Sequence, residues 1–89
     1  GSVASAREEV FAARTQVLVL RDDVLPRARL AIDAVSAGYT AGTLPLVSAL
    51  DAARALWSAQ QELVMAEVTL GTAWARLGRA VGRFDTGSP

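Results

Sequence analysis

The chain has 89 residues, with nine arginines, nine acidic residues and no lysine, histidine or cysteine. It therefore cannot form a disulfide, a zinc site with cysteine or histidine ligands, a thiol nucleophile, a Schiff-base lysine or an imidazole base. The charges balance and the arginines are scattered, so no basic face suited to nucleic acid is expected. A domain of this length built from two helices encloses little core, which predicts contacts with other chains.

The composition favours helices over strands. Apolar residues make up 52% of the sequence, and aromatic residues make up only 6%. Much of the apolar share is alanine. Alanine is the strongest helix former. No stretch is apolar over the roughly 20 residues that a membrane-spanning helix needs, so we expect no direct membrane insertion by this chain and a soluble fragment. Residues 1–2 resemble the remnant of a cleaved tag, and the domain is expected to span residues 3–82.

A first helix is predicted from about residue 5 to residue 41. Ser5 and Glu8 have the spacing of a capping box, which would start this helix. Two adjacent apolar rows follow, each with a seven-residue step: Val10, Val17, Val24 and Ala31, and Phe11, Leu18, Leu25, Ile32 and Tyr39. We interpret the two rows as one stripe that drifts slowly around the helix. Arg7, Arg14 and Arg21 flank the stripe and are expected to form a solvent-exposed edge.

Pro26 is the irregular residue of this first arm. Proline inside a helix removes one hydrogen bond and clashes with the preceding turn. We therefore expect a kink near Asp22 and Asp23, with the apolar stripe continuing beyond it. The alternative is a complete break at this point, which would give a chain of three helices.

Turn-forming residues then interrupt the helical pattern at residues 41–45. Gly42 can adopt positive φ and close the first helix, and Pro45 suits the first turn of a new one. The chain is therefore predicted to reverse direction here. Thr43 and Ser48 compete as the cap of the second helix, which leaves the start of that helix open by several residues.

A second helix is predicted from about residue 46 to residue 82, followed by a flexible tail at 83–89. A row of alanines and a row of leucines run along this helix, and Ala80 and Phe84 extend them. The two rows predict a helix-packing seam that contacts a very close neighbouring helix. The seam consists of Ala52, Leu56, Ala59, Leu63, Ala66, Leu70, Ala73 and Leu77. Further apolar residues adjoin or flank this seam: Leu50, Trp57, Val64, Trp74 and Val81. Either they contact helices of other chains in a larger bundle, or the tryptophans pack under the first arm; both readings remain open.

The predicted fold class is all-α: a long antiparallel two-helix coiled-coil hairpin with arms of matched length. Adjacent carboxylates, such as Asp22 with Asp23, diverge on a helix and cannot form a facing acid/base pair. The sequence contains no nucleophile with a base and no phosphate-binding loop. An enzyme is therefore not expected, nor is a cofactor or metal site.

Several local patterns resemble the TolC-like outer-membrane channel proteins of tripartite efflux pumps, especially the branch that works with heavy-metal efflux. The patterns are Leu25-Pro26-Arg27-Ala28, then Gly38-Tyr39 followed by Ala41-Gly42, then Leu50-Asp51-Ala52 with Arg54 and Leu56, then Gln60, Leu63 and Ala66, and the segment at 77–82. Proteins of that family carry two such hairpins per subunit, and three subunits form a barrel with a helical periplasmic tunnel. The resemblance implies that this chain is one periplasmic hairpin, the second, of such a trimer.

The resemblance also implies that the turn meets the periplasmic adaptor protein. The matching positions are Tyr39, Gly42, Thr43, Leu44 and Pro45. Equally, Gly42, Thr43 and Pro45 would be needed simply to build the turn. The competing functional class is a free-standing helical interaction module, such as a dimer forming a four-helix bundle, with no role in transport.

Overall fold

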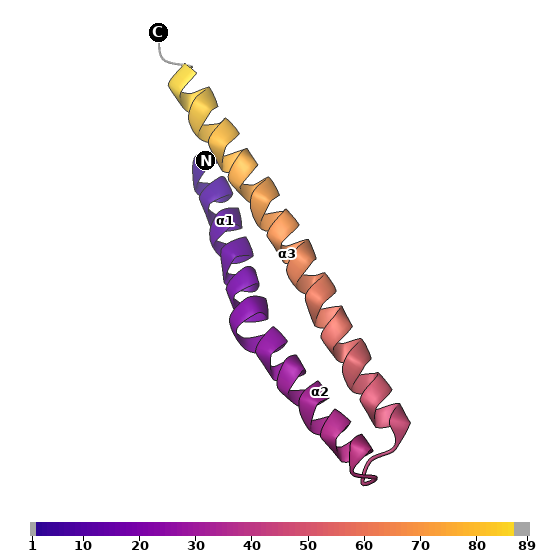
Figure 1. The fold of residues 1–89 in the computed structure, drawn as a ribbon. Coiled ribbons are helices and arrows are strands. Elements are labelled where there is room, and N and C mark those ends of the chain that lie inside the picture. The colour runs from indigo at the N-terminus through magenta and orange to yellow at the C-terminus, as the bar shows by residue number, and fades with distance from the viewer. Residues whose placement is uncertain (1, 87–89) are drawn as a thin grey trace.

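The chain folds into two long helical arms that lie side by side and are joined by a short turn (Figure 1). The computed structural model describes residues 2–86, and the side chains of residues 3–82. Helices α1 (Ser2–Val19) and α2 (Leu25–Thr40), with a π-helical segment between them (Leu20–Val24), form the first arm, and α3 (Leu46–Thr86) forms the second. The molecule measures 73 × 15 × 13 Å. This confirms the predicted all-α hairpin.

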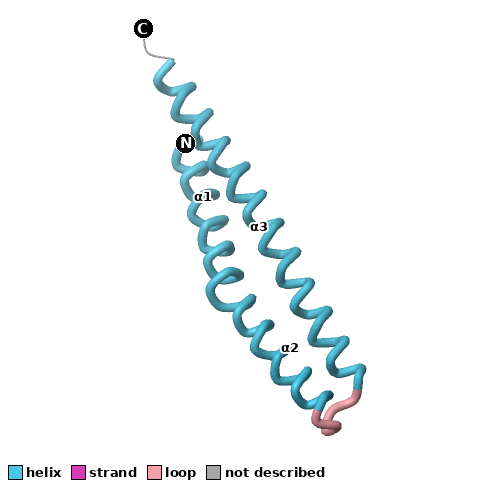
Figure 2. Tube along the Cα trace, viewed as in Figure 1, coloured by secondary structure: helices cyan, strands magenta, loops and turns pink. Residues whose placement is uncertain are grey.

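The first arm is a single continuous helix that bends at the π-helical segment Leu20–Val24. Val19 and Leu25, on either side of it, keep helical backbone angles (φ −62°, ψ −46° and φ −65°, ψ −46°). The backbone N–H of Leu25 donates to the carbonyl of Leu20, five residues earlier rather than four. Figure 2 shows the resulting wider turn between α1 and α2. The predicted kink is therefore correct, and a complete break into separate helices does not occur.

The wide turn accommodates Pro26. This proline lies in the first turn of α2, immediately after the π-helical segment. A proline ring clashes with the carbonyl four residues earlier in a regular α-helix, and π-helical turns relieve such crowding by adding one residue to the loop of each hydrogen bond. The extra residue keeps the arm helical while accommodating the proline.

The same extra residue moves the buried face of the arm from one apolar row to the other. In α1 the first row is buried, with Val10 7% exposed, whereas Phe11 of the second row is 74% exposed. In α2 the order reverses: Leu25 is 6% exposed, and Ala31 of the first row is exposed. The interpretation of a slowly drifting stripe was therefore wrong. The two rows are successive halves of one seam, which steps by one residue at Leu20–Val24.

Helix α3 faces this stepped seam with its alternating alanines and leucines. Ala59, Ala66 and Ala73 are buried, and the leucines of the same face are half-buried. Two buried clusters join the arms: Val10, Ala13 and Ala73 with Leu70 and Leu77, and Val17, Leu20 and Ala66 with Val24, Leu63 and Leu70. The buried alanines of α3 therefore pack against mainly larger residues, valines and a leucine, of the first arm.

Both outer helix ends extend beyond their predicted limits. Helix α1 begins at Ser2, so Ser5 lies inside it and is not the N-cap of a capping box. Helix α3 continues through Gly82 to Thr86, because Gly82 does not take positive φ and nothing in residues 83–86 opposes helix. The part of the predicted tail at 87–89, and the side chain of Phe84, lie outside the described residues.

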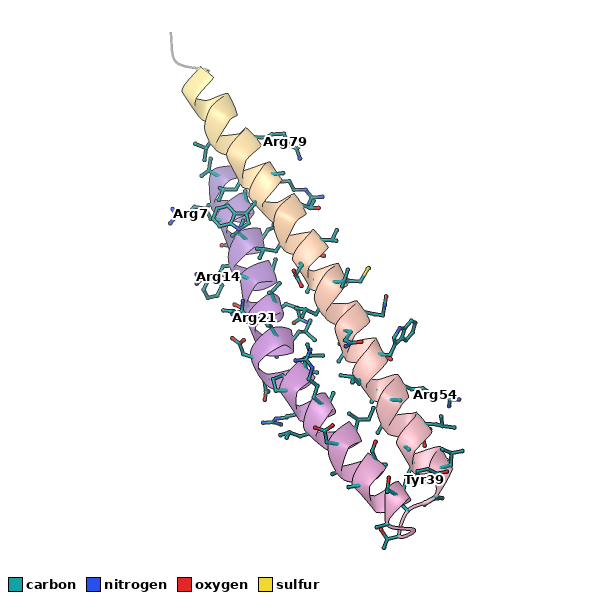
Figure 3. All side chains as sticks on the ribbon, viewed as in Figure 1. Arg7, Arg14, Arg21, Tyr39, Arg54 and Arg79 are labelled. Atoms are coloured by element: carbon teal, nitrogen blue, oxygen red, sulfur yellow. The ribbon has the colours of Figure 1, made fainter. Side chains whose placement is uncertain are left out.

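The polar side chains lie on the outer surface of the hairpin. Arg7, Arg14 and Arg21 are exposed along the first arm, as expected (Figure 3). Asp23 and Arg27 form the expected ion pair one turn apart, with Nε and Oδ1 separated by 2.7 Å. Exposed pairs of this kind contribute little to stability. Within residues 2–86, no helix combines the length and apolarity needed to cross a bilayer.

Candidate functional site

The turn between α2 and α3 is held by a defined set of backbone hydrogen bonds. The N–H of Thr43 donates to the carbonyl of Gly38 (2.9 Å), and the N–H of Gly42 donates to the carbonyl of Tyr39 (3.0 Å). This pair of bonds is a Schellman motif, which ends a helix with a residue in the left-handed conformation. Gly42 occupies that position with φ +81°, as its sequence position indicates. The tip is therefore a fixed turn.

Gly38 has a larger role in the turn than its sequence pattern indicated. Its carbonyl accepts hydrogen bonds from the N–H of Thr43, the N–H of Leu44 (3.2 Å) and the hydroxyl of Thr43 (3.1 Å). A Cβ at position 38 would lie 2.5 Å from Cδ1 of Leu44. Gly38 thus provides both the acceptor and the space for the loop to fold back. The sequence feature that could have indicated this role is the position of Gly38 within a predicted helix, four residues before Gly42, which was expected to adopt the left-handed conformation.

The start of α3 differs from both predicted caps. Helix α3 begins at Leu46, directly after Pro45, and the N–H of Ser48 donates to the carbonyl of Pro45 (3.1 Å). Ser48 is therefore inside the helix. The hydroxyl of Thr43 donates to Gly38 and does not accept a bond from the first turn of α3. Pro45, whose φ is fixed, immediately precedes α3.

The five predicted tip residues, Tyr39, Gly42, Thr43, Leu44 and Pro45, are all exposed at one end of the hairpin. Tyr39, at the end of α2, is 47% exposed (Figure 3). Leu44 is only 38% exposed because it packs on Gly38. Leu46 and Val47, which were not among the predicted tip residues, are more exposed than Leu44, at 51% and 58%. The tip therefore presents a small apolar surface.

A shallow groove between α1 and α3 is crossed by an ion pair between Arg76 and Glu9, with Nη1 and Oε2 separated by 3.3 Å. Its other lining residues are alanines, a glutamine, a valine and threonines. No group of three acidic, histidine or cysteine residues within the described part is placed to hold a metal ion.

One exposed ion pair perturbs the titration of its members. Nε of Arg21 donates to Oδ1 of Asp22 at 2.9 Å. This hydrogen bond lowers the pKa of Asp22 and raises the pKa of Arg21. Both residues are exposed on the outer face of the π-helical segment. The pair stabilises each charge and offers no proton donor or acceptor tuned to neutral pH.

The tip thus combines a fixed turn with exposed apolar side chains at one end of the hairpin. Comparisons with protein-family models, with curated proteins and with solved structures find no match for this chain.

Proposed function

We propose that this chain is a periplasmic helical-hairpin segment of an outer-membrane efflux channel, which docks a periplasmic adaptor protein through its tip. The observation that carries the proposal is the tip itself: a fixed turn at the end of a long hairpin, with exposed apolar side chains around Gly42. The family identity rests on the sequence patterns that resemble TolC-like channels.

The tip has the physical properties that docking requires. A Cβ built on Gly42 would meet no atom within 4 Å, so another helical tip can approach the backbone closely at this point. Tyr39, Leu44 and Leu46 provide apolar area beside it. Because backbone hydrogen bonds already fix the turn, the turn loses little conformational entropy when a partner binds.

The arms would form part of the wall of the duct. Several large apolar side chains on the outer surface of α3 are more than half exposed, including Trp57 at 63% and Val64 at 57%. Contiguous exposed apolar surface is typical of protein–protein contacts. It supports the proposal that the hairpin packs among further helices in a trimeric channel.

The alternative function is a free-standing helical interaction module with no role in transport. The same exposed surface on α3 favours it, because an isolated hairpin would gain most by covering this surface with another helix. The parent gene distinguishes the two. A channel requires a signal peptide, segments of alternating β-strand character and a second similar hairpin.

Binding of the adaptor encoded beside the parent channel gene tests tip docking directly. The hairpin domain of that adaptor would be titrated into the chain and into the variants Leu44→Asp and Gly42→Trp. We expect each variant to weaken binding by about tenfold or more, because a charge or a large ring would then occupy the docking surface.

Leu30→Asp is the matched control. Leu30 is 69% exposed on α2 and lies away from the tip, so this variant should bind as the unmodified chain does. Circular dichroism would show that all variants keep their helices. Equal binding by the two tip variants and the unmodified chain would refute docking through the tip.

A further inference from the structure

Helix α3 carries a second apolar strip that the hairpin leaves uncovered. Its large members are 48% to 63% exposed: Val47, Leu50, Trp57, Val64 and Val68. Together with Arg54 and Gln61, which lie between them, they alternate in steps of three and four residues, as a packing seam does. The midline of the strip lies about 150° around the helix from the seam that contacts the first arm. Arg54 is the only charged residue at these positions.

Small residues continue the same strip toward the C-terminal end of α3. Gly71, Ala75, Gly78 and Gly82 follow Val68 at the same alternating spacing. A Cβ built on any of the three glycines would meet nothing within 4 Å, so packing within the hairpin does not require them. Glycine is the poorest helix former except proline. Their presence in one 41-residue helix is unexplained by the single chain.

We propose that the strip binds the same strip of a second copy, with the two α3 helices antiparallel around a two-fold axis. In this arrangement the large half of each strip meets the small half of the other. The facing positions are Leu50 with Gly82, Arg54 with Gly78, Trp57 with Ala75, Gln61 with Gly71, and Val64 with Val68. An interface between identical surfaces must be self-complementary in this way.

One flank of the strip is complementary in charge in the same register, whereas the other flank places Glu67 opposite Glu67 of the second copy near the axis. Antiparallel coiled coils bring like heptad positions together at their edges, which places Asp51 opposite Arg79. Ser58 then lies opposite Thr72, and Met65 meets Met65 of the second copy near the axis. A parallel pairing would instead place the large residues opposite each other, Trp57 against Trp57, and leave the glycines facing each other. The sequence therefore favours the antiparallel arrangement.

The expected contact is modest in size. The strip from residue 47 to residue 82 is about 50 Å long and about 10 Å wide, so two copies bury on the order of 1,000 Å² in total. This is at the lower end for specific interfaces, and the dimer should dissociate on dilution. Both tips stay free at opposite ends, so the dimer does not compete with docking of an adaptor at the tip. It would compete with packing of the same α3 surface in a channel wall, so it applies to the chain outside such a wall.

Analytical ultracentrifugation of the full chain and of Gly71→Leu tests this proposal. A side chain at position 71 has open space in the hairpin and improves helix propensity, so the variant should keep or raise its melting temperature. In the dimer it would collide with the second helix, and we expect its dissociation constant to rise about tenfold or more. Ala55→Leu, at an exposed position outside the strip, should dimerise as the unmodified chain does. A chain that stays monomeric at millimolar concentration, or a Gly71→Leu variant that dimerises normally, would overturn the proposal.

Cross-linking tests the orientation, because the chain contains no natural cysteine. With a short bis-maleimide, Met65→Cys should cross-link to a second copy of itself. Asp51→Cys should not cross-link alone, but should do so when mixed with Arg79→Cys. Efficient cross-linking of Asp51→Cys by itself would contradict the antiparallel register.

Discussion

Replacing Leu20 with alanine is expected to lower the free energy of unfolding by about 2–5 kcal/mol, the usual cost of removing a buried leucine side chain. Leu20 is the least exposed residue of the described core, at 3%, and packs with Val17 and Ala66. It also begins the π-helical segment, where the seam steps. Small domains are stabilised by only about 5–15 kcal/mol in total, so this variant should lose a large share of its stability.

Leu30→Ala provides the matched comparison for this prediction. Leu30 is 69% exposed on α2, and its truncation should change the free energy of unfolding by less than about 0.5 kcal/mol. Urea denaturation followed by circular dichroism measures both values. Equal effects of the two substitutions would show that Leu20 is not part of the buried seam.

Deleting Asp22 is the second change with a large expected effect. The deletion removes the extra residue of the π-helical segment, so Pro26 would lie within a regular α-helix. There the ring would clash with the preceding turn, at a cost of about 3 kcal/mol. The loss of the exposed Arg21–Asp22 ion pair adds little to this cost.

Adding Pro26→Ala to the deletion should restore most of that stability. Without the proline, the shortened arm can form one regular α-helix whose seam keeps a constant seven-residue repeat. Pro26→Ala alone should have a small effect, because the extra residue still forces the wide turn. Denaturation of the three variants and of the unmodified chain gives the coupling free energy between the deletion and Pro26→Ala. We expect this coupling free energy to be about 3 kcal/mol. A double variant as unstable as the single deletion would mean that the wide turn is needed for another reason.

The hairpin itself followed from the sequence because each of its determinants is local. Gly42 and Pro45 mark the reversal, and the regular alternation of alanine and leucine in α3 marks the face that packs. The spacing of seven residues also identified both apolar rows of the first arm. These features do not depend on contacts between distant residues, so a single sequence suffices to predict them.

The step between the two rows was not predicted, because both rows are apolar along the whole arm. Phe11 and Leu25 belong to the same row, and only the pairing with α3 makes one exposed and the other buried. The clue was Pro26, which indicated an irregularity but not a one-residue change of register. Tertiary packing decides between two apolar faces of one helix, and this information is not local.

The tip shows a similar division between local and distant information. Its five exposed residues were predicted, but Gly38 was noted only as part of a motif, because its role depends on Leu44 folding back over it. Both predicted caps of α3 were wrong for a related reason. Thr43 bonds backward to Gly38, and Pro45 starts α3 without a side-chain cap.

Reaction rates of four single-cysteine variants with a maleimide test the stepped seam most directly. Val10→Cys and Ala31→Cys belong to the first row, and Phe11→Cys and Leu25→Cys belong to the second. We expect positions 11 and 31 to react as fast as an exposed thiol, and positions 10 and 25 to react about tenfold or more slowly, because burial limits access to them. Equal protection of positions 10 and 31, or of positions 11 and 25, would contradict the step and the hairpin packing built on it.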